Sequence, residues 1–157
     1  MTGELPKENE VQDLSAELLE RTEIPGGIEK YLSDLSSDLH PMAQLSIALL
    51  CLQPNSQFKK AYSEDVPKDK YWKSTYDDVI DIIAKLPRIA ALIYRNTYKV
   101  IISILLAPNL NLFLPFQNKK IINANKRLDW GANFAHMMGF ERFEFYEAMR
   151  SYLTLHR

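Results

Sequence analysis

The sequence predicts an all-α fold. Apolar residues recur every three or four positions through most of the 157 residues, which is the spacing of one face of a helix. No stretch shows the sustained alternation of apolar and polar residues that marks a half-buried strand, and no hairpin turn joins two such stretches. The chain also has no internal repeat. These three observations indicate helices packed on helices.

The first two predicted helices lie on either side of a Pro-Gly-Gly break. Residues 10–20 carry apolar side chains on one face and acidic side chains on the other, which is typical of a short amphipathic helix. The sequence Ile-Pro-Gly-Gly at 24–27 predicts the end of this helix. Residues 28–35 regain the helical spacing and predict the second helix.

The third predicted helix, residues 42–52, is apolar on nearly every face. His40 followed by Pro41 is a typical helix start. All-round apolarity predicts a helix surrounded by a larger helical core. We therefore expect this chain alone to expose apolar surface and to be poorly stable. Cys51, the single cysteine, is interpreted as a small buried hydrophobic residue in a reducing compartment, and it excludes a disulfide framework.

The second half of the sequence predicts longer helices. A short helix at 56–62 and a charged loop at 63–70 precede a helical pattern of more than five turns that starts at Tyr71. Pro87 lies inside this pattern and predicts either one bent helix or two helices that meet there. Two further helices flank Gly139.

Five aromatic residues lie at helical spacing in these segments. They are Tyr71, Trp72, Tyr76, Phe143 and Tyr146. A row of exposed rings can stack on nucleic-acid bases, but the helical spacing favours packing in a core. We expect the core.

Composition excludes several classes of function. With 19 basic and 20 acidic side chains the formal net charge is −1, so the chain has no global field for nucleic acid or anionic lipid. The histidines His40, His136 and His156 are far apart and form no HExxH pair, so we expect no metal site. The sequence has no nucleophile elbow and no phosphate-binding glycine loop.

Several motifs resemble, in order, the eukaryotic mitochondrial-type citrate synthases. They are Thr-Gly-Glu-Leu-Pro at 2–6, Asp-Leu-His-Pro-Met-Ala-Gln-Leu-Ser at 38–46, Lys-Tyr-Trp at 70–72, Leu-Pro-Arg-Ile-Ala-Ala at 86–91, Ile-Tyr-Arg-Asn at 93–96, Leu-Asp-Trp at 128–130 with Asn-Phe at 133–134, and Met-Arg-Ser-Tyr-Leu-Thr-Leu-His at 149–156. Each motif is weak alone. Their order along the chain identifies the resemblance.

The resemblance implies a largely helical homodimeric enzyme that condenses acetyl-CoA with oxaloacetate, without a metal or other cofactor. It also implies the mitochondrial matrix, although the first residues here carry no targeting pattern. The family's catalytic histidines and aspartate follow the point that matches Arg157. We therefore expect no catalytic residue in this chain, and an inactive, truncated fragment.

One ligand contact of the family has a counterpart here. Lys68 stands two residues before Lys-Tyr-Trp, where relatives carry an arginine that reaches a phosphate of CoA across the dimer. Lysine can hold a phosphate as a point charge but cannot make the bidentate contact of arginine. The alternative interpretation is that Lys68 is a solvated charge of the loop.

The segment 100–127 departs from the family. It contains no Asp or Glu, whereas relatives have a shorter polar loop with Gly and Ser. We therefore divide the chain into a citrate-synthase-like part at 1–99, an anomalous insertion at 100–127 and a second citrate-synthase-like part at 128–157. One hypothesis is a translated intron, because an intron that opens with GT reads in frame as Val100, and AGG followed by TAA reads as Arg157 and a stop. Genomic and transcript sequence test it.

Other interpretations of residues 100–116 are a membrane helix, a partner-binding helix or a disordered insertion. A membrane span needs about 20 mostly apolar residues, and Pro108 and Pro115 interrupt a shorter run. We expect no membrane span.

Two hypotheses about function remain. The chain derives from a citrate synthase and is itself inactive, or it is a non-catalytic helical interaction protein that associates with the full-length enzyme.

Overall fold

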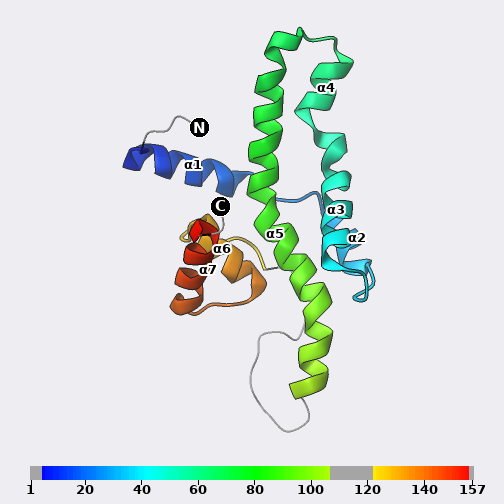
Figure 1. The fold of residues 1–157 in the computed structure, drawn as a ribbon, viewed down its shortest axis with the longest axis vertical. Helices are drawn as coiled ribbons and strands as arrows, with labels where there is room; N and C mark the ends of the chain where they lie inside the picture. The colour runs from blue at the N-terminus through cyan, green and yellow to red at the C-terminus, as the bar shows by residue number, and fades with distance from the viewer. Residues whose placement is uncertain (1–4, 107–121, 156–157) are drawn as a thin grey trace.

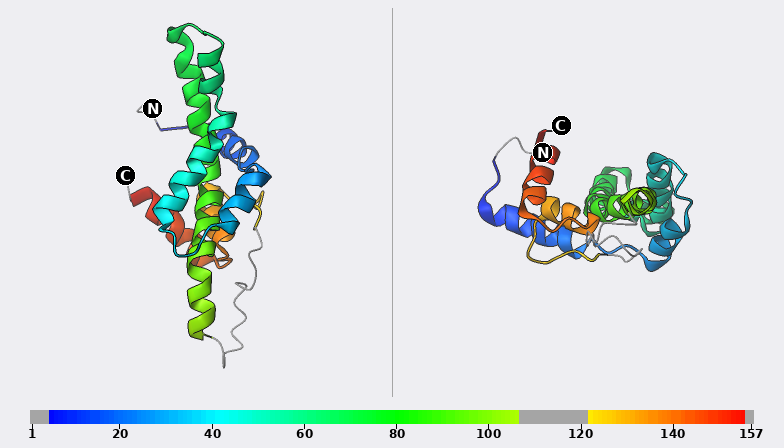
Figure 2. Two further views of the ribbon diagram at one scale, coloured as in Figure 1. Left: turned by 90° about the vertical axis from the view of Figure 1, so that its right-hand side faces the viewer. Right: turned by 90° about the horizontal axis from the view of Figure 1, so that it is seen from below.

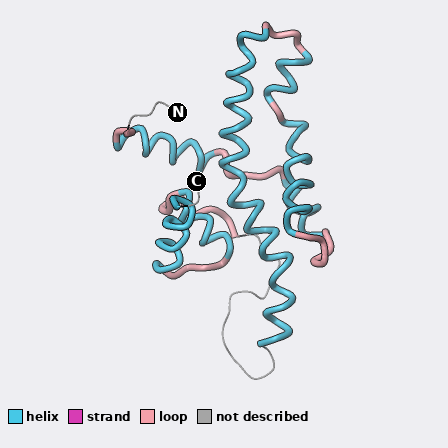
Figure 3. Tube along the Cα trace, viewed as in Figure 1, coloured by secondary structure: helices cyan, strands magenta, loops and turns pink. Residues whose placement is uncertain are grey.

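A computed structural model describes residues 5–106 and 122–155, with the backbone alone for 99–106. Within these ranges the regular secondary structure consists of helices, without a strand, which confirms the all-α prediction (Figure 3). Motif residues 2–4, His156 and most of the predicted insertion at 100–127 lie outside the described residues.

The longest helix, α5 (Tyr71–Leu106), runs through the middle of the molecule between two groups of helices (Figure 1). One group contains α2 (Gly26–Asp34), α3 (Pro41–Leu52) and α4 (Gln57–Ser63), with short 3-10 turns η1 (Gln53–Asn55) and η2 (Lys68–Lys70). The other contains α1 (Glu8–Glu20), α6 (Trp130–Met138) and α7 (Phe143–Leu155). The view from below in Figure 2 also has α5 between the two groups.

The predicted break between the first two helices is shorter than expected. Gly26 and Gly27 are the first residues of α2, and Pro25 is its N-cap residue. The Pro25 carbonyl accepts a hydrogen bond of 2.8 Å from the Ile28 N–H. The first N–H groups of a helix need no partner inside it, so a helix can begin at these glycines. The prediction that both glycines lie outside a helix is wrong.

The main apolar core lies between α2, α3 and α5. Its buried members are Ile24, Ile28, Leu32, Ala48, Leu52, Ile89 and Ile93. Cys51 is half-buried and packs against this cluster. The core is therefore built by one group of helices on one side of α5.

Helix α3 is covered on one side. It buries Gln44, Ala48 and Leu52, while Met42 and Leu50 are 60% and 73% exposed. Within the described residues, α2, α5 and the η1 turn account for its contacts, so the larger helical core that its all-round apolarity predicts does not surround it in this chain. The exposure of Met42 and Leu50 agrees with the prediction that this chain alone leaves apolar surface uncovered.

Helix α4 and the first half of α5 form an arm at one end of the molecule (Figure 1). The rings of Phe58 and Tyr71 meet edge to face, with centroids 5.3 Å apart. Trp72 and Tyr76 are 64% and 59% exposed, and Phe143 is 68% exposed. The prediction that the aromatic residues pack in a core is wrong for these three, because α4 covers one side of the arm and α7 packs on α6.

Helix α5 is continuous through Pro87, so one helix rather than two is formed. Its last residues, 100–106, belong to the predicted insertion, whose beginning therefore extends the helix. No helix in the described ranges is long and apolar enough to cross a membrane.

Helices α6 and α7 form a hairpin. Gly139 separates them as predicted, with φ 99°, a conformation that glycine adopts without steric cost. The Gly139 N–H donates to the His136 carbonyl at 2.8 Å, and the Phe140 N–H donates to the Ala135 carbonyl at 3.0 Å. These bonds close the end of α6.

Candidate functional site

Lys68 is the first residue of η2, between α4 and α5, and its side chain is exposed. Asp65, three residues earlier, has φ 51°, which turns the chain at the end of α4. Lys70 adds a second exposed cation in the same turn. Asp69 lies between the two lysines and is also exposed, so the turn is a charged surface of mixed sign at the end of the arm.

Asp78 on α5 anchors the beginning of α4 and so fixes the helix that leads into this turn. Its carboxylate accepts hydrogen bonds from the Ser56 hydroxyl at 2.6 Å, from the Gln57 N–H at 2.7 Å and from the Phe58 N–H at 3.1 Å. Free N–H groups at a helix start bind a carboxylate well. The arm thus holds the Lys68 turn from both ends, because η2 leads directly into α5.

A buried amide pair joins two of the motifs found in the sequence. Gln44 of α3 is fully buried, and its Oε1 accepts a 3.1 Å hydrogen bond from Nδ2 of Asn96 on α5. The Gln44 amide donates to the Leu39 carbonyl at 2.7 Å, and Asn96 donates to the Leu35 carbonyl at 3.2 Å. These bonds satisfy the buried amides and fix α3 against α5.

Arg88 is the centre of an ionic group in which Glu29 is buried and Glu23 is exposed. Its guanidinium donates to Glu29 of α2 at 2.6 Å, to Glu23 at 2.9 Å and to Asn123 at 3.2 Å. The side chains of Arg88 and Glu29 are 5% and 12% exposed. One side chain of α5 therefore joins α2, the α1–α2 connection and the segment that leads to α6.

Asp129 and Arg150 join α6 to α7. One oxygen of Asp129 accepts from the Ala132 N–H at 3.0 Å and caps α6, while the other accepts from Arg150 Nε at 2.8 Å. Burial acts to raise the pKa of Asp129, but the hydrogen bonds from Arg150, Ala132 and Gly131 outweigh it and lower the pKa. The carboxylate is therefore ionised at neutral pH.

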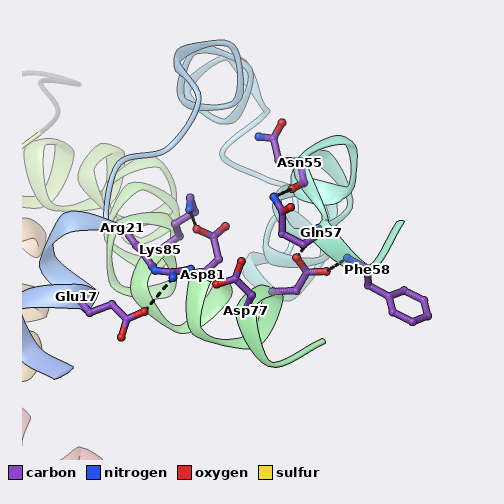
Figure 4. A network of polar contacts seen from close by, with 9 residues as sticks. Glu17, Arg21, Asn55, Gln57, Phe58, Asp77, Asp81 and Lys85 are labelled. Carbon is purple, nitrogen blue, oxygen red and sulfur yellow. Dashed lines mark hydrogen bonds and ion pairs between the residues drawn. The ribbon is translucent and has the colours of Figure 1, made fainter. Parts of the chain in front are cut away.

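On the side of α5 opposite α4, Arg21 joins α1 to α5. It reaches Asp77 of α5 at 2.8 Å and Glu17 of its own helix at 2.9 Å (Figure 4). Both partners are 43% exposed, so solvent weakens these pairs.

The histidines have separate positions. His40 is the N-cap residue of α3, as predicted, and its Nδ1 accepts from the Met42 N–H at 3.2 Å. His136 lies in the last turn of α6. Within residues 5–106 and 122–155, no group of three or more His, Cys, Asp or Glu side chains could hold a metal ion.

Sequence reasoning did not find the partners of Gln44, Arg88 and Asp129. One signal was available, since Gln44 and Arg88 are polar residues inside apolar helical faces. The described structure thus uses its motif residues mainly to join helices.

The fold and these contacts define a class: an all-α protein segment in which buried polar side chains hold helices in register, with an exposed turn that carries Lys68 and Lys70. A family model described as "Citrate synthase, C-terminal domain" matches residues 1–157. The chain belongs to the citrate synthase family, which confirms the resemblance.

Three relatives illustrate the similarity. The chain is 40% identical over 156 residues to the mitochondrial citrate synthase of Saccharomyces cerevisiae, covering 99% of this chain and 29% of the relative. It is 41% identical over 157 residues to the mitochondrial 2-methylcitrate synthase of Yarrowia lipolytica, covering 99% and 30%. It is 37% identical over 156 residues to the peroxisomal citrate synthase of S. cerevisiae, covering 99% and 30%. The chain spans under a third of their length.

Proposed function

We propose that the chain supplies part of the helical framework of a citrate synthase, the acyltransferase that condenses acetyl-CoA with oxaloacetate to give citrate and CoA. The observation that carries the proposal is the match of 99% of the chain to 29% of a mitochondrial citrate synthase. The described polar network supports a framework role, because Gln44, Arg88 and Asp129 bind other helices. We propose that these 157 residues have no synthase activity by themselves.

The acyl donor and the compartment are part of the proposal. One relative is named for 2-methylcitrate, which has one carbon more than citrate, and two are named for citrate. We propose acetyl-CoA as the donor, without a metal or cofactor. We propose the mitochondrial matrix as the compartment, with the peroxisome as the alternative that one relative supports.

The purified chain is expected to release no CoA from acetyl-CoA and oxaloacetate, because the catalytic histidines and aspartate that the family resemblance implies have no counterpart in these residues. The measurement is free thiol formed over time, at chain concentrations up to those of a substrate. A full-length citrate synthase is the positive control, and an acyl-CoA one carbon longer tests the 2-methylcitrate alternative. Turnover within about tenfold of the full-length enzyme would contradict the proposal.

A second function is favoured by the uncovered face of α3. Met42 and Leu50 are exposed there, and an apolar helix face of this kind fits a protein interface. The chain would then bind full-length synthase in place of one subunit of the homodimer. Adding the chain to the full-length enzyme in the same assay separates the two hypotheses. An interaction protein should lower the activity of the full-length enzyme, and the chain with Leu50→Asp should not.

We propose that Lys68 contacts a phosphate of CoA. Titration with CoA is expected to shift the backbone resonances of residues 68–70, and 3′-dephospho-CoA is expected to shift them less, because a phosphate is missing. Lys68→Ala should remove most of the difference between the two ligands. Lys70→Ala is the matched control, since it removes an exposed cation from the same turn. Equal effects of both substitutions would contradict a specific contact.

A further inference from the structure

Pro87 leaves one carbonyl of α5 without its usual donor. In an α-helix the N–H of each residue bonds to the carbonyl four residues earlier, and proline has no N–H. The affected carbonyl is that of Ile83. Helix α5 continues through Pro87, so the carbonyl of Ile83, a residue that is 36% exposed, has no donor within the helix.

Trp130, the first residue of α6, fills this position. Its indole Nε1 donates to the Ile83 carbonyl at 3.1 Å. Asp129 caps α6 immediately before it and is held in turn by Arg150 of α7. The donor is therefore carried by a helix start whose position is set within the hairpin itself.

Small apolar side chains also take part on this side of α5, beside the hydrogen bond from Arg88 to Asn123 that holds the segment leading to α6. Ala84 on α5 and Ala132 and Ala135 on α6 are almost fully buried. Such surfaces permit close approach but carry little information about register. Helix α7 has no buried residue and packs on α6, so it moves with α6.

We propose that Pro87 and Trp130 form a latch that holds the α6–α7 hairpin on α5 in one register, and that the hairpin opens as one unit when this bond breaks. Inside a regular helix the carbonyls are already bonded, so the Ile83 carbonyl is a preferred acceptor for a donor from another helix. Its position selects where α6 docks. Helix α5 keeps its structure on opening, because its core contacts with α2 and α3 lie on the other side.

Native-state hydrogen exchange of the full chain tests the latch. Trp130→Phe keeps the ring and removes the donor, and the amides of α6 are expected to exchange about fivefold faster, as the loss of one ordinary hydrogen bond predicts. The amides of 89–93 in α5 are expected to keep their exchange rates. Trp72→Phe is the matched control, because Trp72 is 64% exposed and should leave both regions unchanged.

Pro87→Ala supplies the missing N–H to the Ile83 carbonyl. In that background Trp130→Phe should accelerate exchange in α6 clearly less than it does with Pro87 present. An equal effect in both backgrounds would overturn the latch, and so would joint acceleration of α5 and α6. If Trp130→Phe fails to fold, Pro87→Ala alone is decisive: the Trp130 indole proton must exchange faster than in the unsubstituted chain, and an unchanged rate refutes the proposal.

Discussion

Replacing Arg88 with methionine is expected to lower the free energy of unfolding by about 3 kcal/mol, the cost of breaking a buried ion pair. Methionine preserves much of the side-chain length but removes the charge. The Glu29 carboxylate, with its side chain 12% exposed, then stays buried without its cation. Urea unfolding followed by circular dichroism measures the change in the free energy of unfolding, and its dependence on urea concentration should be the same in both proteins.

Two comparisons make this result specific. Arg21→Met also removes an arginine from an ion pair between helices, but the Arg21 side chain is 30% exposed and that of Asp77 is 43% exposed, so a cost below about 1 kcal/mol is expected. Replacing both Arg88 and Glu29 with methionine should recover much of the loss, since no buried charge remains. Equal costs for Arg88→Met and Arg21→Met would refute the buried-pair interpretation.

Ile89→Ala is expected to cost about 3 kcal/mol, within the usual range for removing a large aliphatic side chain from a core. Ile89 has no exposed surface and lies where α2, α3 and α5 meet. The alanine leaves a cavity. Helix α5 cannot shift to fill it, because Arg88 and Asn96 hold α5 to its neighbours.

Ile82→Ala is the control for this substitution. Ile82 lies two turns earlier on nearly the same face of α5, but it is 37% exposed. Helix propensity changes equally in both variants, so the difference between them reports burial. We expect Ile82→Ala to cost about 1 kcal/mol or less. Similar costs at both positions would mean that the core at Ile89 is not close-packed.

The helices were largely predictable because their signals are local. The spacing of apolar residues located the helices, and the ends marked by His40 with Pro41 and by Gly139 were right. The start of α2 was predicted two residues too late, because Gly26 and Gly27 can either separate two helices or form the first residues of the second. Burial of Trp72 and Tyr76 was also wrong, since helical spacing defines an apolar face but not the element that covers it.

The contacts that join the helices were not predictable. Arg88 and Glu29 are 59 residues apart in the sequence, and Gln44 and Asn96 are 52 apart. Nothing in the local pattern of either partner identifies the other. The candidate contact Lys68 came from the family resemblance, and the structure adds that its turn is exposed at the end of a well-anchored arm.

The sequence by itself determined the helical class, most helix ends and the family, because each depends on neighbouring residues or on the order of short motifs. Only the tertiary structure decided that α5 continues through Pro87, that Trp130 bonds to the Ile83 carbonyl, and which apolar faces stay uncovered. The physical reason is that backbone and side-chain groups choose partners by proximity in space. Proximity in space depends on how all the helices pack, which no single segment specifies.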